Sequence, residues 1–339
     1  VGVLMKKILA ILLCIVVMFQ LPVTVLANDS KEKNDKINAK SVCLMALDTG
    51  EVLYAENEYK ELSPASVTKI MSLLLVLEAL DSGKIKLTDK VTASKEAVAM
   101  GGSQIWLEVG EVMTVEELLK AVIIASANDA HYSCAYDLAV ISCEVMKHPL
   151  ITKYSTIWLD SLRGGKTELN NTNKLVKSYN GITGLKTGTT SNAGFCVSAT
   201  ASRDGLNLVA VVLGSDTSEH RFDTASYLLD TGFANYSCIN INVDKKKIKP
   251  VKVKNGKEKE VNPVYDRNIK LIIPKGSDNL TYKYKIKKEV KAPIKKGDKL
   301  GKIEVISNDK KIKSIPLYSD KVVETVDFNY IFLKIFKHI

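Results

Sequence analysis

Ser66 and Lys69 stand three residues apart in "SPASVTKIMSLLLVLEAL", residues 63–80, where a short polar stretch becomes an apolar helix. Residues at i and i+3 share one face of a helix, so the lysine amine reaches the serine hydroxyl. The positive end of the helix dipole and partial burial both disfavour a protonated lysine there. A neutral amine beside a hydroxyl can serve as general base to a nucleophile. The alternative is a pair of solvated polar residues at a helix start.

The Ser-x-x-Lys spacing carries little information by itself, because it recurs at Ser30/Lys33 and at Ser307/Lys310. Neither of those pairs opens an apolar helix. The chemical interpretation therefore depends on polar motifs further along the chain.

Two such motifs follow. Ser126-Ala-Asn128 ends a second amphipathic helix and supplies a hydroxyl and an amide where that helix meets a loop. Lys186-Thr187-Gly188 leaves a predicted strand, and its glycine permits close approach of the backbone to a ligand. Together with Ser66 and Lys69, these residues predict nucleophilic catalysis in one groove.

The elements that position these motifs can be predicted from local patterns. Residues 41–57 predict two strands joined by a hairpin at Asp48-Thr49-Gly50. Residues 64–82 predict a helix, with Ser63 as its N-cap, Pro64 at its first position and Gly83 as its C-cap.

Later segments complete the first module. Thr114 and Glu117 predict a capping box at the start of a second helix, and residues 134–147 predict another. The second helix would bury the stripe Leu118, Leu119, Val122 and Ile123. Residues 181–216 predict a strand that enters Lys186 and then a hairpin with its turn at Asp204-Gly205, and residues 218–236 return to helix. The predicted fold class is α+β, an antiparallel sheet with packed helices.

Beyond about residue 245 the sequence consists of short alternating runs broken by Gly, Pro and Asn, which predicts a small all-β domain. From Lys245 onward the chain holds 26 Lys+Arg against 11 Asp+Glu, whereas the preceding part holds 22 against 27. Lysine-rich strands can be solvated faces that discourage edge pairing. They can also face an anionic membrane or cell-wall surface.

Both ends of the chain carry apolar segments. The basic Lys6 and Lys7, an apolar run and small residues up to Ala27 predict a secretory signal peptide, the alternative being a retained membrane anchor. Export argues against nucleic acid as a partner. The final "DFNYIFLKIFKHI" is too short to span a bilayer and predicts a helix in the membrane interface, the alternative being a helix docked on its own domain. Its apolar side would hold Phe328, Ile331, Phe332, Ile335, Phe336 and Ile339.

We expect no metal and no organic cofactor. The four histidines show no ligand spacing, and no glycine-rich phosphate loop is present in the sequence. The cysteines that follow the predicted signal peptide are odd in number and form no CxxC pair, so we expect buried thiols rather than a disulfide frame. They are Cys43, Cys134, Cys143, Cys196 and Cys238.

In the order in which they occur, "SPASVTKI", "SAND" and "GLKTGTT" resemble the three motifs of penicillin-binding serine DD-peptidases. The closer resemblance is to the low-molecular-mass D-alanyl-D-alanine carboxypeptidases. It extends through "MGGSQIWLEVGEVMTVEELLK", "HYSCAYDLA" and "RDGLNLVAVVLGSDTSEHRF", and it includes the C-terminal β domain and the amphipathic tail. The resemblance implies a β-lactamase/DD-peptidase-like catalytic domain.

The resemblance also implies a role for each matching position. Ser66 would attack the D-Ala-D-Ala carbonyl of a peptidoglycan stem peptide and become acylated, and Lys69 would take its proton. Ser126 would help to pass a proton to the departing D-alanine, and Asn128 would orient the substrate amide. β-Lactam antibiotics would act as covalent inhibitors.

The remaining positions would bind substrate. Lys186 and Thr187 would hold the terminal carboxylate within a segment that includes Gly188, and Arg221 would add positive charge there. The backbone N–H groups of Ser66 and Thr189 would form the oxyanion hole, at about 3–4 kcal/mol of the barrier per donor.

We therefore expect four regions. They are a signal peptide at 1–27, a DD-peptidase domain at 28–243, a basic all-β domain at 244–323 and an amphipathic helix at 324–339. The exported protein would lie at the outer face of the cytoplasmic membrane, held peripherally by its last helix.

One departure from the family pattern concerns the chain after Ser126-Ala-Asn128. Family members carry several dozen residues there, whereas here Ala130 runs directly into His131. The alternative function is accordingly a catalytically impaired relative that binds wall peptide or a partner protein. A β-lactamase is disfavoured, because no glutamate is evidently placed to activate water.

Overall fold

The computed structural model describes residues 35–99, 104–125, 133–277 and 279–336. The chain divides into a short N-terminal unit, Val1–Ile37, and a unit Asn38–Ile339 that contains every element named below. The predicted signal peptide lies outside the described residues. No helix within the described ranges is both long and apolar enough to cross a lipid bilayer.

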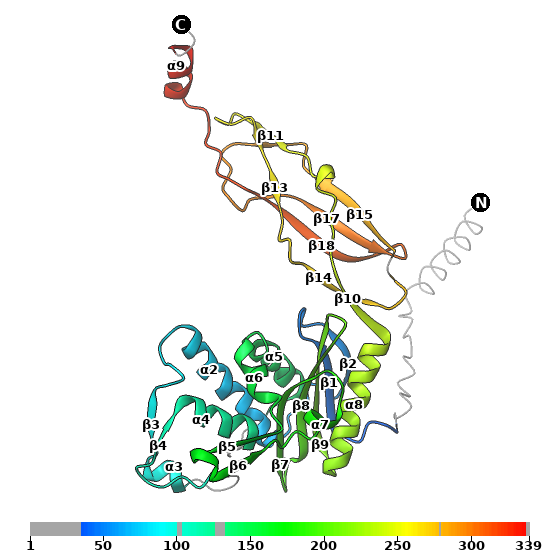
Figure 1. The fold of residues 1–339 in the computed structure, drawn as a ribbon. Helices are drawn as coiled ribbons and strands as arrows, with labels where there is room; N and C mark the ends of the chain where they lie inside the picture. Colours follow the sequence, from blue (N-terminus) through cyan, green and yellow to red (C-terminus); the bar gives the residue numbers. More distant parts are fainter. Residues whose placement is uncertain (1–34, 100–103, 126–132, 278, 337–339) are drawn as a thin grey trace, which may run out of the picture. The chain divides into compact units, whose positions relative to one another are not determined.

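A five-stranded antiparallel sheet forms the centre of the first part of the long unit (Figure 1). Its strands, in spatial order, are β2 (Val52–Glu56), β1 (Ser41–Ala46), β9 (Leu206–Ser215), β8 (Gly194–Arg203) and β7 (Ile182–Thr190). The predicted hairpin at 41–57 is confirmed, as is the strand through Lys186. The turn between β8 and β9 has positive φ at both Asp204 and Gly205, the conformation that a tight hairpin turn requires.

Helices cover both faces of this sheet. Figure 1 shows α8 (Ser218–Asn235) on one face and α2 (Lys69–Asp81), α4 (Val115–Lys120), α5 (Ala135–Val145) and α6 (Pro149–Ser155) on the other. Side chains alternate across β1, so that Cys43 and Met45 join the core beneath α2 and α5, whereas Leu44 lies against Gly232 of α8. All six residues of β1 are buried because both faces of the strand are covered, and all but Ser41 are apolar.

The helix that was predicted over 64–82 begins differently from the prediction. A 3₁₀ turn, η1 (Ala65–Thr68), precedes α2, with Pro64 in the cap position and no side-chain cap hydrogen bond. Ser63 is therefore not the N-cap, and α2 itself begins at Lys69. The helix ends at Asp81 with Ser82 as its C-cap, one residue before the prediction, and Gly83 follows with φ +71° and an N–H that bonds to Leu80 O at 3.0 Å.

The second predicted helix has its capping box. The Glu117 N–H donates to Thr114 Oγ1 at 3.2 Å, and the Thr114 N–H donates to Glu117 Oε2 at 2.8 Å. Leu119 and Ile123 of the predicted stripe are buried, while Leu118 and Val122 are partly buried. After α4 the chain widens into a π-helical segment, η2 (Ala121–Ala125), which the sequence pattern does not predict.

Small elements surround these helices. They are β3 (Lys90–Thr92) paired with β4 (Val112–Thr114), β5 (Leu159–Leu162) paired with β6 (Thr167–Asn170), the turn η3 (Arg163–Gly165), α3 (Lys95–Ala99) and α7 (Leu175–Ser178). The predicted helix at 134–147 corresponds to α5. The observed antiparallel sheet with packed helices confirms the α+β fold class.

The C-terminal part is built from strands, as predicted. One group comprises β10 (Tyr236–Asn240) with β14 (Lys270–Pro274), and another comprises β12 (Glu260–Val261), β11 (Val251–Lys254) and β16 (Glu289–Lys291). A four-stranded sheet contains β13 (Pro263–Val264), β18 (Lys310–Ser319), β17 (Lys299–Ser307) and β15 (Leu280–Ile286). The turn η4 (Lys245–Lys247) and the helix α9 (Phe328–Phe336) complete it. Valines and lysines alternate between buried and exposed positions along β11, so the lysines lie on a solvated face.

The five cysteines that follow the predicted signal peptide are free thiols. Four are buried and Cys238 is partly buried. Burial raises the pKa of Cys43 and of Cys143 to about 12, so both stay protonated at neutral pH.

Candidate active site

Ser66 and Lys69 lie side by side at the junction of η1 and α2. The Lys69 Nζ donates to Ser66 Oγ at 2.9 Å, and Ser66 is only 6% exposed. In a 3₁₀ turn, residues at i and i+3 lie directly above one another, so the unpredicted turn brings the two side chains together. Ala65 has φ +47°, a left-handed conformation that costs an alanine free energy and bends the chain just before Ser66.

The amine is held in place by the helix that follows it. Ile70, Leu73, Leu74 and Leu77 of α2 are buried in the core, so the first residue of the helix has little freedom to move. The hydroxyl and the amine are therefore preorganised rather than assembled by chance at a surface.

Strand β7 packs directly against η1 at Gly188. A β-carbon built on Gly188 would lie 2.6 Å from Pro64 O and 2.7 Å from the Ser66 backbone nitrogen. Since real β-carbons essentially never approach so closely, only glycine allows β7 to lie this near to the serine. The glycine of the Lys186-Thr187-Gly188 motif is thus required for contact between two motifs that are more than one hundred residues apart.

Lys186 is buried under this contact, at 1% exposure, and its Nζ donates to Thr187 O at 3.1 Å. Burial holds the pKa of Lys186 well below its ordinary value, and the nearby positive charges of Lys69 and Arg221 lower this pKa further. The side chains of Lys69, Lys186 and Arg221 therefore lie in one neighbourhood.

Arg221 approaches from the first turn of α8 and is 6% exposed. Its Nη1 donates to Thr189 Oγ1 at 3.0 Å, to Gly188 O at 3.2 Å and to Cys196 O at 3.3 Å, while its Nε is buried without a hydrogen-bond partner. Burial lowers the pKa of Arg221 to about 10. No carboxylate of the described residues forms an ion pair with it, so its positive charge is not neutralised within the described structure.

Sequence reasoning missed Thr172, whose hydroxyl accepts a hydrogen bond from Thr187 Oγ1 at 2.7 Å. The Thr172 N–H in turn reaches Ile124 O at 3.4 Å, so the end of η2 lies near β7. Thr172 follows a short strand in an irregular segment without a motif of its own, and no pattern in the sequence indicates it.

Ser126 and Asn128 lie outside the described residues. The structure does describe the chain on either side of them: η2 ends at Ala125, and Ser133 forms an antiparallel bridge with Leu62. Of the predicted site residues, the structure therefore brings together the set from η1, α2, β7 and α8. These are Ser66, Lys69, Lys186, Thr187, Gly188, Thr189 and Arg221.

Comparison with family models agrees with this geometry. The model described as D-alanyl-D-alanine carboxypeptidase matches residues 28–131 and 130–217, and the C-terminal domain of penicillin-binding protein 5 matches residues 236–325. The first model matches in two stretches that meet at Ala130 and His131. That interruption agrees with a shortened connection at this point of the chain.

Curated relatives and solved structures agree as well. The chain is 34% identical over 374 residues to the D-alanyl-D-alanine carboxypeptidase DacF of Bacillus subtilis, covering 96% of each. That alignment is longer than the 339 residues of this chain, which therefore carries gaps against that relative. The crystal structure of penicillin binding protein 5 from Haemophilus influenzae superimposes with a TM-score of 0.77 at 26% identity, covering 85% of this chain and 98% of that one.

A third relative is the cefotaxime-bound penicillin-binding protein D2 of Listeria monocytogenes, with a TM-score of 0.53 and 25% identity, covering 58% of this chain and 98% of that one. The family model covers more than half of the chain. Its description agrees with the arrangement of Ser66 and Lys69 beside Lys186 and Arg221. The chain belongs to the D-alanyl-D-alanine carboxypeptidase family.

Proposed function

We propose that this chain removes the terminal D-alanine from peptidoglycan stem peptides through an acyl-Ser66 intermediate, and that β-lactams acylate the same serine. The observation that carries the proposal is the 2.9 Å contact between Ser66 Oγ and Lys69 Nζ, beside the buried basic side chains of Lys186 and Arg221. It is supported by the family to which the chain belongs.

In the proposed first step, the Lys69 amine takes the proton of Ser66 as the Oγ attacks the scissile carbonyl carbon. A neutral amine is needed for this role. The C–N bond to the terminal D-alanine then breaks, its nitrogen gains a proton, and the peptide stays as an ester on Ser66. Water hydrolyses that ester in the second step.

The carbonyl oxygen would carry negative charge during both steps. We assign the Ser66 and Thr189 N–H groups as its donors, at about 3–4 kcal/mol each. A side chain at position 188 would lie on the Ser66 nitrogen, so the glycine also keeps this N–H accessible.

The terminal carboxylate of the substrate would bind beside Lys186 and Arg221. Arg221 offers a guanidinium and Lys186 a buried amine, and the Thr187 hydroxyl would donate to the carboxylate after turning away from Thr172, to which it donates in the described structure. Binding an anion there would relieve the repulsion between the positive charges of Lys186 and Arg221. The roles of Ser126 in proton transfer to the leaving amine and of Asn128 in orienting the substrate amide remain part of the proposal.

The test is intact-mass measurement of the purified protein after incubation with benzylpenicillin. We expect one covalent adduct on the wild type and none on Ser66→Ala, together with release of D-alanine by the wild type from a peptide ending in D-Ala-D-Ala. An adduct without D-alanine release would favour the impaired relative as the function, with the shortened segment after Ala130 as its cause. Absence of both from a folded protein would overturn the proposal.

We further propose the four regions and the location expected from the sequence: a signal peptide at 1–27, a catalytic domain at 28–243, a basic β domain at 244–323 and a membrane-associating helix at 324–339. The location would be the outer face of the cytoplasmic membrane. Exposed apolar side chains on α9 support the last assignment, with Phe328 78%, Ile331 49% and Phe332 50% exposed.

The base of α9 is tied to the β domain by Lys257. Its Nζ lies 2.7 Å from Glu324 and 3.1 Å from Asp327, and the Tyr330 hydroxyl donates to the Lys257 carbonyl at 2.9 Å. A helix tethered at one end can present its apolar side to a lipid surface. Sedimentation with vesicles of phosphatidylglycerol tests this, and we expect binding by the wild type to be largely lost when Phe328, Ile331 and Phe332 are all changed to Ser.

A further inference from the structure

Trp106 is an exposed tryptophan in a strained backbone conformation. Its side chain is 79% exposed and its φ is +55°, a left-handed value that is a genuine outlier for a bulky residue. Neither feature benefits the core. Such outliers persist only where surrounding contacts enforce them, and they cluster at functional sites.

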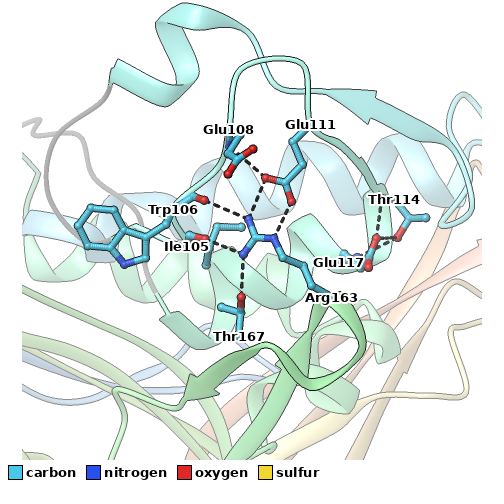
Figure 2. A network of polar contacts seen from close by, with 8 residues as sticks. All are labelled: Ile105, Trp106, Glu108, Glu111, Thr114, Glu117, Arg163 and Thr167. Carbon is cyan, nitrogen blue, oxygen red and sulfur yellow. Dashed lines mark hydrogen bonds and ion pairs between the residues drawn. The ribbon is translucent and has the colours of Figure 1, made fainter.

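The contacts that enforce this conformation come from Arg163 (Figure 2). Its Nη1 donates to Ile105 O at 2.8 Å, and its Nη2 donates to Trp106 O at 3.3 Å. Glu111 holds the guanidinium through both carboxylate oxygens, at 2.6 Å to Nε and 2.9 Å to Nη2. The Glu108 N–H also donates to Glu111, at 3.0 Å, so the loop 105–111 closes around one arginine.

The indole points away from this network, as Figure 2 shows, so the network shapes the loop without covering the ring. Arg163 is itself strained, with φ +54°. Among the described non-glycine residues with positive φ, Asn and Asp account for all but Ala65, Trp106 and Arg163. Ala65 adjoins the proposed nucleophile, and the other two contact one another.

The loop is connected to the active site by β6. Thr167 of β6 accepts a hydrogen bond from Arg163 Nη1 at 2.8 Å, and Thr172, just past the end of β6, bonds to Thr187. Thr167 and Thr172 are five positions apart, and five residues of chain span at most about 17 Å. Arg163, which holds the Trp106 loop, thus contacts the start of β6, and the chain just past the end of β6 contacts Thr187 of the proposed carboxylate site. The span from Thr167 to Thr172 is comparable with the length of a short extended peptide.

We propose that Trp106 is a saccharide-binding residue that stacks on the glycan of a peptidoglycan substrate while the stem peptide extends to Ser66, and that Arg163 is its positioning residue. This inference rests on the proposed function. The face of an indole is electron-rich, so it attracts the C–H groups on the flat face of a pyranose ring, and the exposed Glu108 in the same loop can accept from sugar hydroxyls. A rigid ring binds with little loss of side-chain entropy, which explains why the loop is clamped.

The first experiment compares two substrates that share the same D-Ala-D-Ala peptide, one free and one linked to the disaccharide. For Trp106→Ala we expect the ratio of kcat/KM for the disaccharide-peptide to kcat/KM for the free peptide to fall about tenfold, chiefly through KM. Trp106→Phe keeps an aromatic face and should restore most of the ratio. The matched control is Tyr318→Ala, another exposed aromatic residue, which should leave the ratio as in the wild type.

Arg163→Lys keeps the charge but loses the planar fork that holds Glu111 and two carbonyl groups at once. We expect it to lower the same ratio in the same direction as Trp106→Ala. A merely structural role would reduce turnover of both substrates equally and leave their ratio unchanged.

The second experiment measures binding of a peptide-free oligomer of β-1,4-linked N-acetylglucosamine by intrinsic fluorescence, with wild type and Trp106→Phe. A saturable change in the wild type that weakens in the variant is expected. An unchanged substrate ratio, or an oligomer that does not bind the wild type, would overturn the inference and leave a protein partner as the occupant of this surface. If instead the wild type hydrolyses neither substrate and takes up no β-lactam, the proposed function fails, and the oligomer titration still decides the role of Trp106.

Discussion

Two arginines of this protein have opposite electrostatic environments. Arg221 is buried, donates only to carbonyl and hydroxyl oxygens in the described structure, and has its pKa lowered to about 10 by burial. Arg163 is partly exposed and forms a bidentate pair with Glu111, which raises its own pKa. The same pairing lowers the pKa of Glu111 to about 2.

Arg221 therefore belongs to a site that lacks a carboxylate partner in the described structure, whereas Arg163 belongs to a structural network that already contains one, Glu111. A buried cation without a carboxylate partner costs stability, and a ligand that supplies the carboxylate recovers that cost. A paired arginine gains little from a further anion, but it fixes the backbone around it. The comparison therefore predicts that changes near Arg221 alter catalysis, whereas changes near Arg163 alter stability and loop geometry.

The largest expected effect is that of Gly188→Ala. The added methyl group must displace Pro64 or the Ser66 backbone, and a misplacement of about 1 Å at a reacting group lowers rates about 100-fold. The second-order rate of acylation by benzylpenicillin measures this. Gly205→Ala is the control, since its β-carbon would meet no atom within 4 Å, although its φ of +78° makes a small loss of stability expected there. Equal acylation rates in Gly188→Ala and wild type would contradict the packing of β7 on η1.

Arg221→Met should lower acylation by a carboxylate-bearing β-lactam about 10- to 100-fold, because a charge-assisted hydrogen bond contributes about 1.5–3 kcal/mol. With a β-lactam whose carboxylate is esterified, the difference between variant and wild type should largely disappear. If both compounds lose reactivity to the same extent, Arg221 acts through the fold rather than through an anion, and the contrast between the two arginines breaks down.

Proton uptake on ligand binding sharpens the comparison. The pKa of Lys186 lies well below its ordinary value of 10.5 because of burial and of the charges on Lys69 and Arg221, and a bound carboxylate would raise it. Between the lowered pKa and 10.5 the lysine is therefore more protonated with ligand than without. Calorimetry of the Ser66→Ala variant with a D-Ala-D-Ala peptide, in buffers of different ionisation enthalpy, should detect uptake of a fraction of a proton. Release of protons on binding would contradict the prediction that a bound carboxylate raises the pKa of Lys186.

The smallest effect concerns stability. Glu111→Gln should lower the free energy of unfolding by about 1 kcal/mol at neutral pH, as expected for a well-formed bidentate pair near the surface. The pKa of Glu111 is depressed to about 2 from 4.5, so the pair stabilises the fold above 4.5 and loses that contribution as the pH falls towards 2. Urea unfolding of both proteins at several pH values checks this. Glu61→Gln, at an exposed glutamate that forms no ion pair with the described residues, is the control, and a difference that persists unchanged at pH 2–3 would count against the pair.

Much of the fold could be predicted from local patterns because local interactions cause it. The capping box of Thr114 and Glu117, the glycine that ends α2 and the turn at Asp204-Gly205 each depend on neighbours a few residues away. The α+β class follows from such elements in series. The start of α2 was predicted incorrectly, since a 3₁₀ turn at Ala65–Thr68 precedes it and packs against β7, a contact between segments far apart in the sequence.

The sequence alone determined which residues have chemistry to offer, since a hydroxyl, an amine and two further polar motifs can be identified by type and spacing. Only the tertiary structure decided that Gly188 touches the Ser66 backbone, that Thr172 bonds to Thr187, and that Arg163 pairs with Glu111 across 52 positions of the chain. The physical reason is the separation along the chain of the residues that interact. Hydrogen-bonded turns and caps form between near neighbours, whereas the burial of Lys186 and Arg221, and with it their lowered pKa values, arises when distant segments exclude water together.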